Sequence, residues 1–226
     1  MAIDVRPFGQ LFAEPTRNGL TRPKAVRGFG IKMVNMGELF ARPRLHNAPM
    51  DRVPLNESEA RKFLLNEGDL LFARQSLVLE GAGKCSLFLK DDEPVTFESH
   101  VTRVRLDPCK ADPHFYFYYL QSPHGVEAIR SIVEQGAGAS GIRGSDLEGL
   151  HVQWRPVTEQ RVIAHIPRHA RRQDRTEPAD QRDAGGDRAG IVQIMVRRFR
   201  SYPRQGRRPR PRPPQAYRRP LSSPLH

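Results

Sequence analysis

Three hydrogen-bonding side chains follow a short apolar segment near the middle of the chain. Residues 70–73 read Leu-Leu-Phe-Ala and predict a strand. The polar residues come directly after it: Arg74, Gln75 and Ser76. A Gly-Ala-Gly turn at 81–83 then predicts a chain reversal, and 85–89 predicts the return strand. The spacing therefore predicts a β-hairpin that presents three polar side chains where a buried strand ends, an arrangement that many α/β domains share.

A glycine-rich segment further along the chain resembles a nucleotide-binding pattern only in part. Gly136, Gly138 and Gly141 match Gly-x-Gly-x-x-Gly, but a predicted helix rather than a strand precedes them. No acidic residue ends a following strand about 20 residues later, as the dinucleotide folds require. An enzyme that binds a nucleotide at this loop is therefore an open interpretation, but it ranks below the two binding-protein interpretations given at the end of this subsection.

Other catalytic motifs also fail. Gly83-Lys84 resembles the end of a phosphate-binding loop, but Val78 stands where its first glycine belongs and Cys85 replaces its Ser or Thr. The histidines and cysteines have no metal-ligand spacing, the serines lie in no nucleophile elbow, and no adenine-methyltransferase motif (Asp/Asn-Pro-Pro-aromatic) is present. We therefore expect no catalytic residue and no metal site, and a binding protein is favoured over an enzyme.

Strands and helices alternate through the first 166 residues. The predicted strands cover 31–36, 101–106 and 151–154, and the predicted helices cover 57–65, 113–122, 125–134 and 158–166. Asn56 with Glu59, and Asp112 before Pro113, mark helix starts. The aromatic run in 113–122 indicates a buried core helix rather than a base-stacking platform. The fold class is therefore mixed α/β or α+β, with short strands and helices around one modest core and loops over 1–30, 42–54 and 136–150.

The charge is concentrated at one end of the chain. Residues 1–166 hold 21 Lys and Arg against 20 Asp and Glu, whereas residues 167–226 hold 16 Arg, no Lys and 5 acidic residues. Most of the overall charge of +12 therefore comes from residues 167–226. This tail has 9 prolines and no apolar periodicity, which predicts disorder. Cys85 and Cys109 have no disulfide or metal-ligand spacing, so we expect both to be buried, reduced thiols. The sequence has no signal peptide or membrane span, so we expect a cytoplasmic protein.

Three segments together resemble the target-recognition domain of a type I restriction-modification specificity (S) subunit. They are EGDLLFARQSLVLEGAGKCSLF (67–88), the helix pair with its glycine-rich exit (113–154), and RPVTEQRVIAHI (155–166). The family pattern has a Gly-Asp-apolar strand ending in polar residues, an aromatic helix, a glycine-rich loop with Ser and a following Asp-Leu, and a Pro-x-x-Glu-Gln helix entry. Ser145-Asp146-Leu147 and Pro156 with Glu159-Gln160 match the last two features. The likeness covers about residues 25–166.

The resemblance implies sequence-specific recognition of double-stranded DNA. A specificity subunit is not itself catalytic but directs methyltransferase (M) and restriction (R) subunits, to which S-adenosylmethionine, ATP and Mg would belong. Base edges are read by Arg, Lys, Gln and Asn, while basic and small polar groups contact phosphates. The candidate DNA-binding residues on loops are Arg22, Lys24, Arg27, Lys32, Asn35, Arg74, Gln75, Ser76, Ser140 and Arg143. No cofactor is expected in this chain.

The chain departs from the family after Ile166, where a long amphipathic helix should continue. With a permitted choice of codons, removing one base after the Ile166 codon converts residues 167–177 into Leu-Gly-Thr-Leu-Asp-Asp-Lys-Ile-Glu-Leu, which resembles the start of that helix. The same offset converts 190–202 into another family-like sequence. We therefore expect a recognition domain over 1–166 and a frameshifted tail over 167–226. The alternative is a free-standing protein whose Arg-rich tail binds nucleic acid non-specifically.

Overall fold

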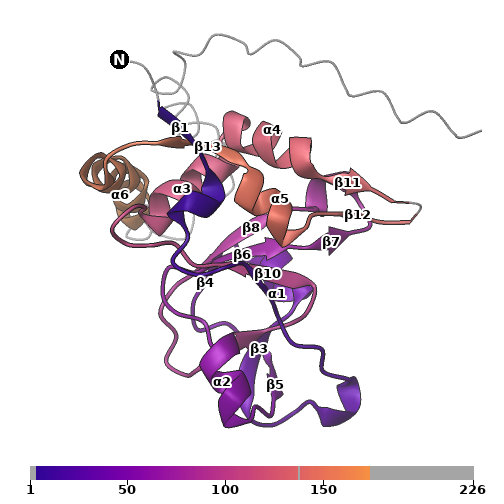
Figure 1. The fold of residues 1–226 in the computed structure, drawn as a ribbon. Coiled ribbons are helices and arrows are strands. Elements are labelled where there is room, and N and C mark those ends of the chain that lie inside the picture. Colours follow the sequence, from indigo (N-terminus) through magenta and orange to yellow (C-terminus); the bar gives the residue numbers. More distant parts are fainter. Residues whose placement is uncertain (1–3, 137, 174–226) are drawn as a thin grey trace, which may run out of the picture.

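The computed structural model describes residues 4–136 and 138–173, and a five-stranded sheet lies at its centre (Figure 1). In spatial order the strands are β2 (Arg17–Asn18), β10 (Val101–Val104), β6 (Leu70–Ala73), β8 (Cys85–Phe88) and β4 (Arg44–Leu45). The central strand β6 pairs antiparallel with both β10 and β8, and β4 joins the edge parallel to β8. The apolar segment 70–73 is thus the middle strand of the main sheet.

Strand β6 separates two hydrophobic clusters. Leu70 and Phe72 belong to the first cluster, and Leu71 and Ala73 belong to the second. All four side chains are fully buried, because successive residues of a strand point to opposite faces and both faces are covered. The prediction of one modest core is therefore wrong, since the sheet has a core on each side.

The first cluster is covered by the helices of the upper group in Figure 1. These are η1 (Phe8–Leu11), α3 (Pro113–Gln121), α4 (Pro123–Ile132) and α5 (Gly144–Gly149), with α6 (Val157–Gln173) packed beside α3. A two-stranded sheet of β1 (Asp4–Pro7) and β13 (His151–Trp154) lies at the edge of this group. Every residue from Phe115 to Leu120 is buried, which confirms that the aromatic helix belongs to the core.

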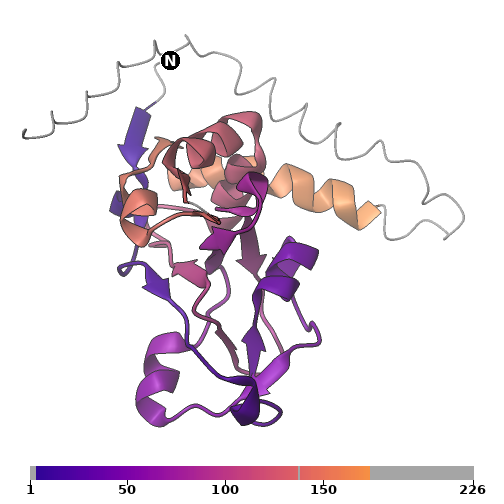
Figure 2. The ribbon, with the colours of Figure 1, turned by 90° about the vertical axis from the view of Figure 1, so that its right-hand side faces the viewer.

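The second cluster is covered by a smaller group, at the bottom of Figures 1 and 2. Strand β3 (Ile31–Val34) lies between β5 (Asp51–Val53) and β9 (Val95–Phe97), flanked by η2 (Lys24–Val26), α1 (Met36–Ala41) and α2 (Glu57–Phe63). Asn56 caps α2, because its side chain accepts from the backbone N–H of Glu59 at 2.9 Å. This helix start is as the sequence predicted.

A buried arginine holds β10 against the loop between α2 and β6. The Arg103 side chain is 2 % exposed, and its guanidinium donates to Glu14 at 2.9 Å and to the carbonyls of Lys62 and Leu64 at 3.3 Å. Arg105, directly after β10, binds Asp69 at 2.7 Å. A buried guanidinium needs such partners, so these contacts fix how the smaller group joins the central sheet.

Several predicted boundaries need correction. The segments predicted as loops contain η1, β1, α5 and the short strands β4 and β5, because pairing and packing with distant segments order them.

Cys109 is exposed rather than buried, whereas burial raises the pKa of the Cys85 thiol. The backbone of α6 continues to Gln173, beyond the predicted end at Ile166. The remainder of the expected disordered tail, 174–226, lies outside the described residues. Within the described part of the chain, no helix is long and apolar enough to cross a membrane.

Candidate nucleic-acid interface

The predicted polar trio and the glycine-rich loop meet in one small sheet. Strand β12 (Ser140–Gly141) lies between β11 (Glu134–Gln135) and β7 (Gln75–Ser76). Ser140 pairs with Ser76 and Gly141 with Gln75, and the Ile142 N–H donates to the Arg74 carbonyl at 2.9 Å. Five candidates from two distant segments therefore come together in and beside this sheet, with Ser76 and Ser140 on one face and Gln75 on the other. This region is called here the hairpin surface: Arg74, Gln75, Ser76, Ser140 and Arg143.

The glycine turn holds β7 in this position. The Ser76 hydroxyl accepts from the Val78 N–H at 3.2 Å, and the Gly81 N–H donates to the Val78 carbonyl at 3.1 Å within η3 (Leu79–Gly81). A Cβ on Gly81 would lie 2.1 Å from the Ser76 hydroxyl oxygen, so only glycine allows this approach. Gly83 has a φ of +76° and donates its N–H to the Ala73 carbonyl at 2.8 Å, which returns the chain to β8. The turn thus fixes the backbone of the candidate residues Gln75 and Ser76.

The side chains of the hairpin surface keep hydrogen-bonding capacity for a ligand. Gln75 is exposed, and its amide makes no hydrogen bond within the described residues. Arg74 is half-buried, and its guanidinium makes one long contact, 3.4 Å to the Ser99 carbonyl. Arg143 is exposed and pairs with Glu134 at 2.5 Å. A free amide beside a guanidinium is the set of groups that binds adenine and guanine edges.

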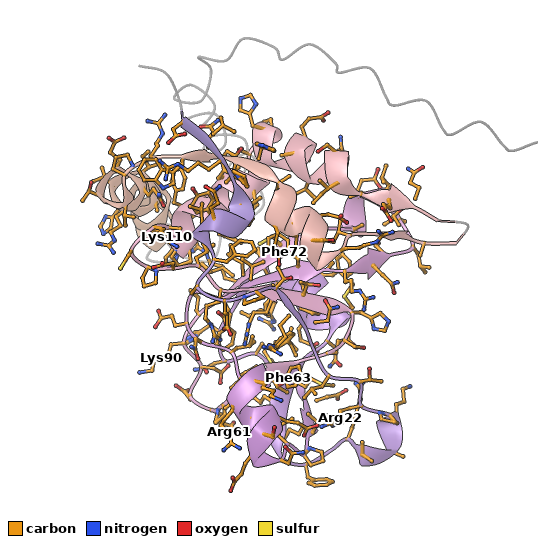
Figure 3. The ribbon with its side chains drawn as sticks, viewed as in Figure 1. Arg22, Arg61, Phe63, Phe72, Lys90 and Lys110 are labelled. Carbon is orange, nitrogen blue, oxygen red and sulfur yellow. The ribbon has the colours of Figure 1, made fainter. Side chains whose placement is uncertain are left out.

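The other five candidates form a second region, called here the basic segment: Arg22, Lys24, Arg27, Lys32 and Asn35. They lie in the smaller group, and Figure 3 places Arg22 near Arg61 and Phe63 there. Arg22 binds Glu59 at 2.5 Å, and Arg27 binds Asp51 at 3.0 Å. These cations are therefore already paired with carboxylates of the same chain.

Lys32 is neutralised in the same way, by Asp91 at 3.0 Å and Glu93 at 3.4 Å. The hydrogen bond to Asp91 raises the pKa of Lys32, and the hydrogen bond from Arg22 lowers the pKa of Glu59. Both shifts favour the charged forms, so the pairs persist at neutral pH. Lys24 is exposed and makes no ion pair within the described residues, which leaves it as the cation of this segment that is open to a phosphate.

Asn35 has a local structural role that the sequence did not predict. It precedes α1, and its backbone N–H donates to the Glu38 carboxylate at 2.9 Å. Its side-chain oxygen accepts from Arg27 at 2.9 Å, and its amide nitrogen donates to the Met33 carbonyl at 3.3 Å. The Asn-x-x-Glu spacing was a helix-start signal that could have revealed this role.

The two regions lie on opposite sides of the central sheet. In Figure 1 the β7–β11–β12 sheet belongs to the upper group and η2 to the lower group, and both project toward the same side of the molecule. In Figure 2, turned so that this side faces the viewer, the β11–β12 hairpin lies in the upper part of the molecule and η2 at the bottom. A single elongated ligand on this side could contact both regions.

The structure provides no enzymatic arrangement at the glycine-rich loop. Gly136 and Gly141 flank the β11–β12 turn of an antiparallel sheet, whereas a dinucleotide fold needs a strand-to-helix turn in a parallel sheet. In the described part of the chain, no three His, Cys, Asp or Glu side chains gather as a metal site would require.

A pocket of about 550 Å³ lies between α1, η3, α3 and α4, and its lining includes Lys84 and Arg130 but only one carboxylate, that of Glu80. The hairpin surface therefore carries the chemistry best suited to binding.

Comparisons with known proteins find similar chains. The chain is 29 % identical over 148 residues to the type I restriction enzyme EcoKI specificity subunit of Escherichia coli (strain K12), covering 65 % of this chain and 32 % of that protein. It is 24 % identical over 146 residues to the StySPI specificity subunit of Salmonella potsdam, covering 65 % and 31 %. The chain is similar to type I specificity subunits. No known family profile matches it.

Solved specificity-subunit structures share the fold. A chain from a type I R-M system, solved to explain complex assembly and conformational transition, superposes with a TM-score of 0.55 at 16 % identity, covering 76 % of this chain and 38 % of that one. The HsdS subunit from Thermoanaerobacter tengcongensis superposes with a TM-score of 0.53 at 14 % identity, covering 85 % and 42 %. The chain thus spans about a third of the length of the curated specificity subunits that it matches.

Proposed function

We propose that this chain recognises a specific DNA sequence as part of the specificity subunit of a type I restriction-modification system. One observation supports the proposal: the pairing of β7 with β12 holds Gln75, whose amide is exposed and free of internal hydrogen bonds, next to Arg74 in a chain that is similar to specificity subunits. The Gln75 amide suits adenine N6 and N7, and the Arg74 guanidinium suits guanine O6 and N7. Lys24 and Arg143 suit the phosphates on either side.

In this proposal the chain has no catalytic role of its own. Methyltransferase and restriction subunits would carry S-adenosylmethionine, ATP and Mg and would be directed to the site that this chain reads. The recognition domain is near neutral, with 21 basic and 20 acidic residues over 1–166, so the isolated chain should bind its site weakly and a cytoplasmic complex should add affinity. DNA would lie along the side on which both projections lie in Figure 1.

Selection from a pool of random duplexes tests the proposal. The full-length chain would be incubated with the pool at near-physiological salt with excess non-specific competitor DNA, and bound duplexes would be sequenced over several rounds. We expect enrichment of one short motif, corresponding to one half of a bipartite target. Salt-sensitive binding without any enriched motif would instead support the alternative of a non-specific binder whose Arg-rich tail contacts phosphates.

We further propose that the sequence after Ile166 is out of frame with the family helix. Type I assembly needs that helix as the docking surface for the methyltransferase subunits, and residues 167–226 carry 16 Arg and 9 Pro without an apolar repeat. The chain as it stands should therefore fail to co-purify with its methyltransferase subunit, and deleting one base near the Ile166 codon should restore co-purification. Binding of the unaltered 226-residue chain to that subunit would contradict the frameshift.

A further inference from the structure

The turn that follows Gln75 and Ser76 also has two solvent-exposed apolar side chains. Leu77 is 88 % exposed and Val78 is 60 % exposed, directly after Gln75 and Ser76 of β7. Single exposed apolar residues are common on proteins. Here two are consecutive, and they are attached to a turn whose backbone is held by the Ser76 and Gly81 contacts. They are thus held in place without contributing to either core.

The spacing of Leu77 from Gln75 matches the chemistry of an A·T base pair. Leu77 lies at the bend between β7 and η3, two residues after Gln75, and both of these side chains are exposed. In the major groove an A·T pair presents adenine N6 and N7, which bind a Gln amide, together with the thymine 5-methyl group, which binds an apolar side chain. The groove is wide enough to admit a narrow β-ribbon, and β7, β12 and β11 form a sheet of two-residue strands.

We infer that Leu77 is a specificity-determining residue that contacts the 5-methyl group of a thymine in the DNA site, beside the base edge that Gln75 reads. This inference rests on the proposed function and adds an apolar contact to it. Val78 continues the apolar surface toward the adjoining base pair. The neighbouring Arg74, whose guanidinium makes only one long contact within the described residues, favours DNA as the ligand of this turn over an uncharged surface.

Removal of the methyl group itself tests the inference. In the motif selected by the full-length chain, each thymine is replaced in turn by deoxyuridine, which keeps the base pairing and lacks only the methyl group. We expect one replacement to weaken binding by about four-fold, the value of one buried methyl group. Leu77→Ala should weaken binding to the unmodified site by a similar factor and should no longer respond to that replacement. Leu77→Met, which keeps an apolar side chain of similar length, should still respond.

Val162→Ala is the matched control, because Val162 is also a bare apolar residue, 64 % exposed, but lies on α6. It should leave both the affinity and the deoxyuridine response unchanged. The inference is wrong if removal of the methyl group still weakens binding of Leu77→Ala by the same factor, or if no thymine replacement weakens binding of the unaltered chain. In either case the selected motif would still support the proposed function. If no motif is selected at all, the proposed function and this inference both fail.

Discussion

The hairpin surface and the basic segment differ in what their side chains already bind. In the basic segment, Arg22, Arg27 and Lys32 are each paired with a carboxylate of the same chain. On the hairpin surface, Arg143 is paired with Glu134, but the Gln75 amide makes no hydrogen bond within the described residues, and the adjoining Leu77 is exposed. A count of cations in the sequence favours the basic segment, whereas the hairpin surface has an uncharged hydrogen-bonding group that is free for a ligand.

The largest effect on DNA reading should come from disturbing the hairpin backbone. Gly81→Ala places a methyl group 2.1 Å from the Ser76 hydroxyl oxygen and 3.3 Å from Phe40 Cε1, so β7 must shift away from its position. We expect a stability cost of about 1–3 kcal/mol, typical of overpacking, and loss of the selected motif's advantage over random DNA. Gly37→Ala is the control, because nothing lies within 4 Å of a Cβ there. Unchanged motif preference in Gly81→Ala would mean that the position of β7 does not matter for reading.

Truncation of Arg74 should have the next largest effect. Its guanidinium makes only one long internal contact, so Arg74→Ala should leave the fold intact. If the contact is bidentate to guanine, the change should cost about 1–3 kcal/mol of discrimination and relax one base position. Competition binding with every single-base variant of the selected motif measures this. An equal loss on all variants would restrict Arg74 to a phosphate contact.

Truncation of Lys24 should produce a smaller effect of a different kind. Lys24 is exposed and unpaired among the described residues, so it suits a phosphate rather than a base. Lys24→Ala should weaken binding to all duplexes alike and reduce the slope of log affinity against log salt by about 1. A change of preferred motif would place the basic segment among the base-reading elements and remove the contrast between the two regions.

The smallest expected effect concerns stability against acid. The Arg22 hydrogen bond lowers the pKa of Glu59 below its ordinary value of 4.5, so the stabilisation is present above pH 4.5 and is lost as the pH falls through the lowered pKa. Glu59→Gln should therefore lower the free energy of unfolding near pH 7 and have progressively less effect toward pH 3. Urea titrations of both proteins from pH 3 to pH 7 check this. A difference that does not shrink on acidification would exclude the Arg22 ion pair as its cause.

Local sequence predicted the elements that have strong local signals. Strand 70–73 and strand 151–154 have the predicted bounds, and Asp112 and Asn56 cap the helices that follow them. The pairing of β7 with β12 could not be predicted, because Ser76 and Ser140 are far apart in the sequence and each strand has only two residues. The acidic partners of the basic segment were missed for the same reason, since Asp91 and Glu59 reach it only through the tertiary fold.

The resemblance to specificity subunits supplied a set of candidate residues without ranking them. It placed Asn35 beside Gln75 as an equal candidate, whereas Asn35 binds Arg27 and the Met33 carbonyl. Asn35 and Gln75 differ in exposure and in internal hydrogen bonding, and neither property can be predicted from residue type alone. Leu77 was not among the candidates, because an apolar residue next to a predicted strand reads as core until its exposure is known.

The central claim is that the hairpin surface reads base sequence, and the most direct measurement is the base-preference profile of Gln75→Ala. Random-duplex selection would be run in parallel with the unaltered chain and with Gln135→Ala, an exposed glutamine on β11 of the same small sheet. We predict that Gln75→Ala loses preference at one adenine position by about 1–3 kcal/mol and keeps the rest of the motif, while Gln135→Ala keeps the whole motif. A profile for Gln75→Ala identical to that of the unaltered chain would contradict the claim.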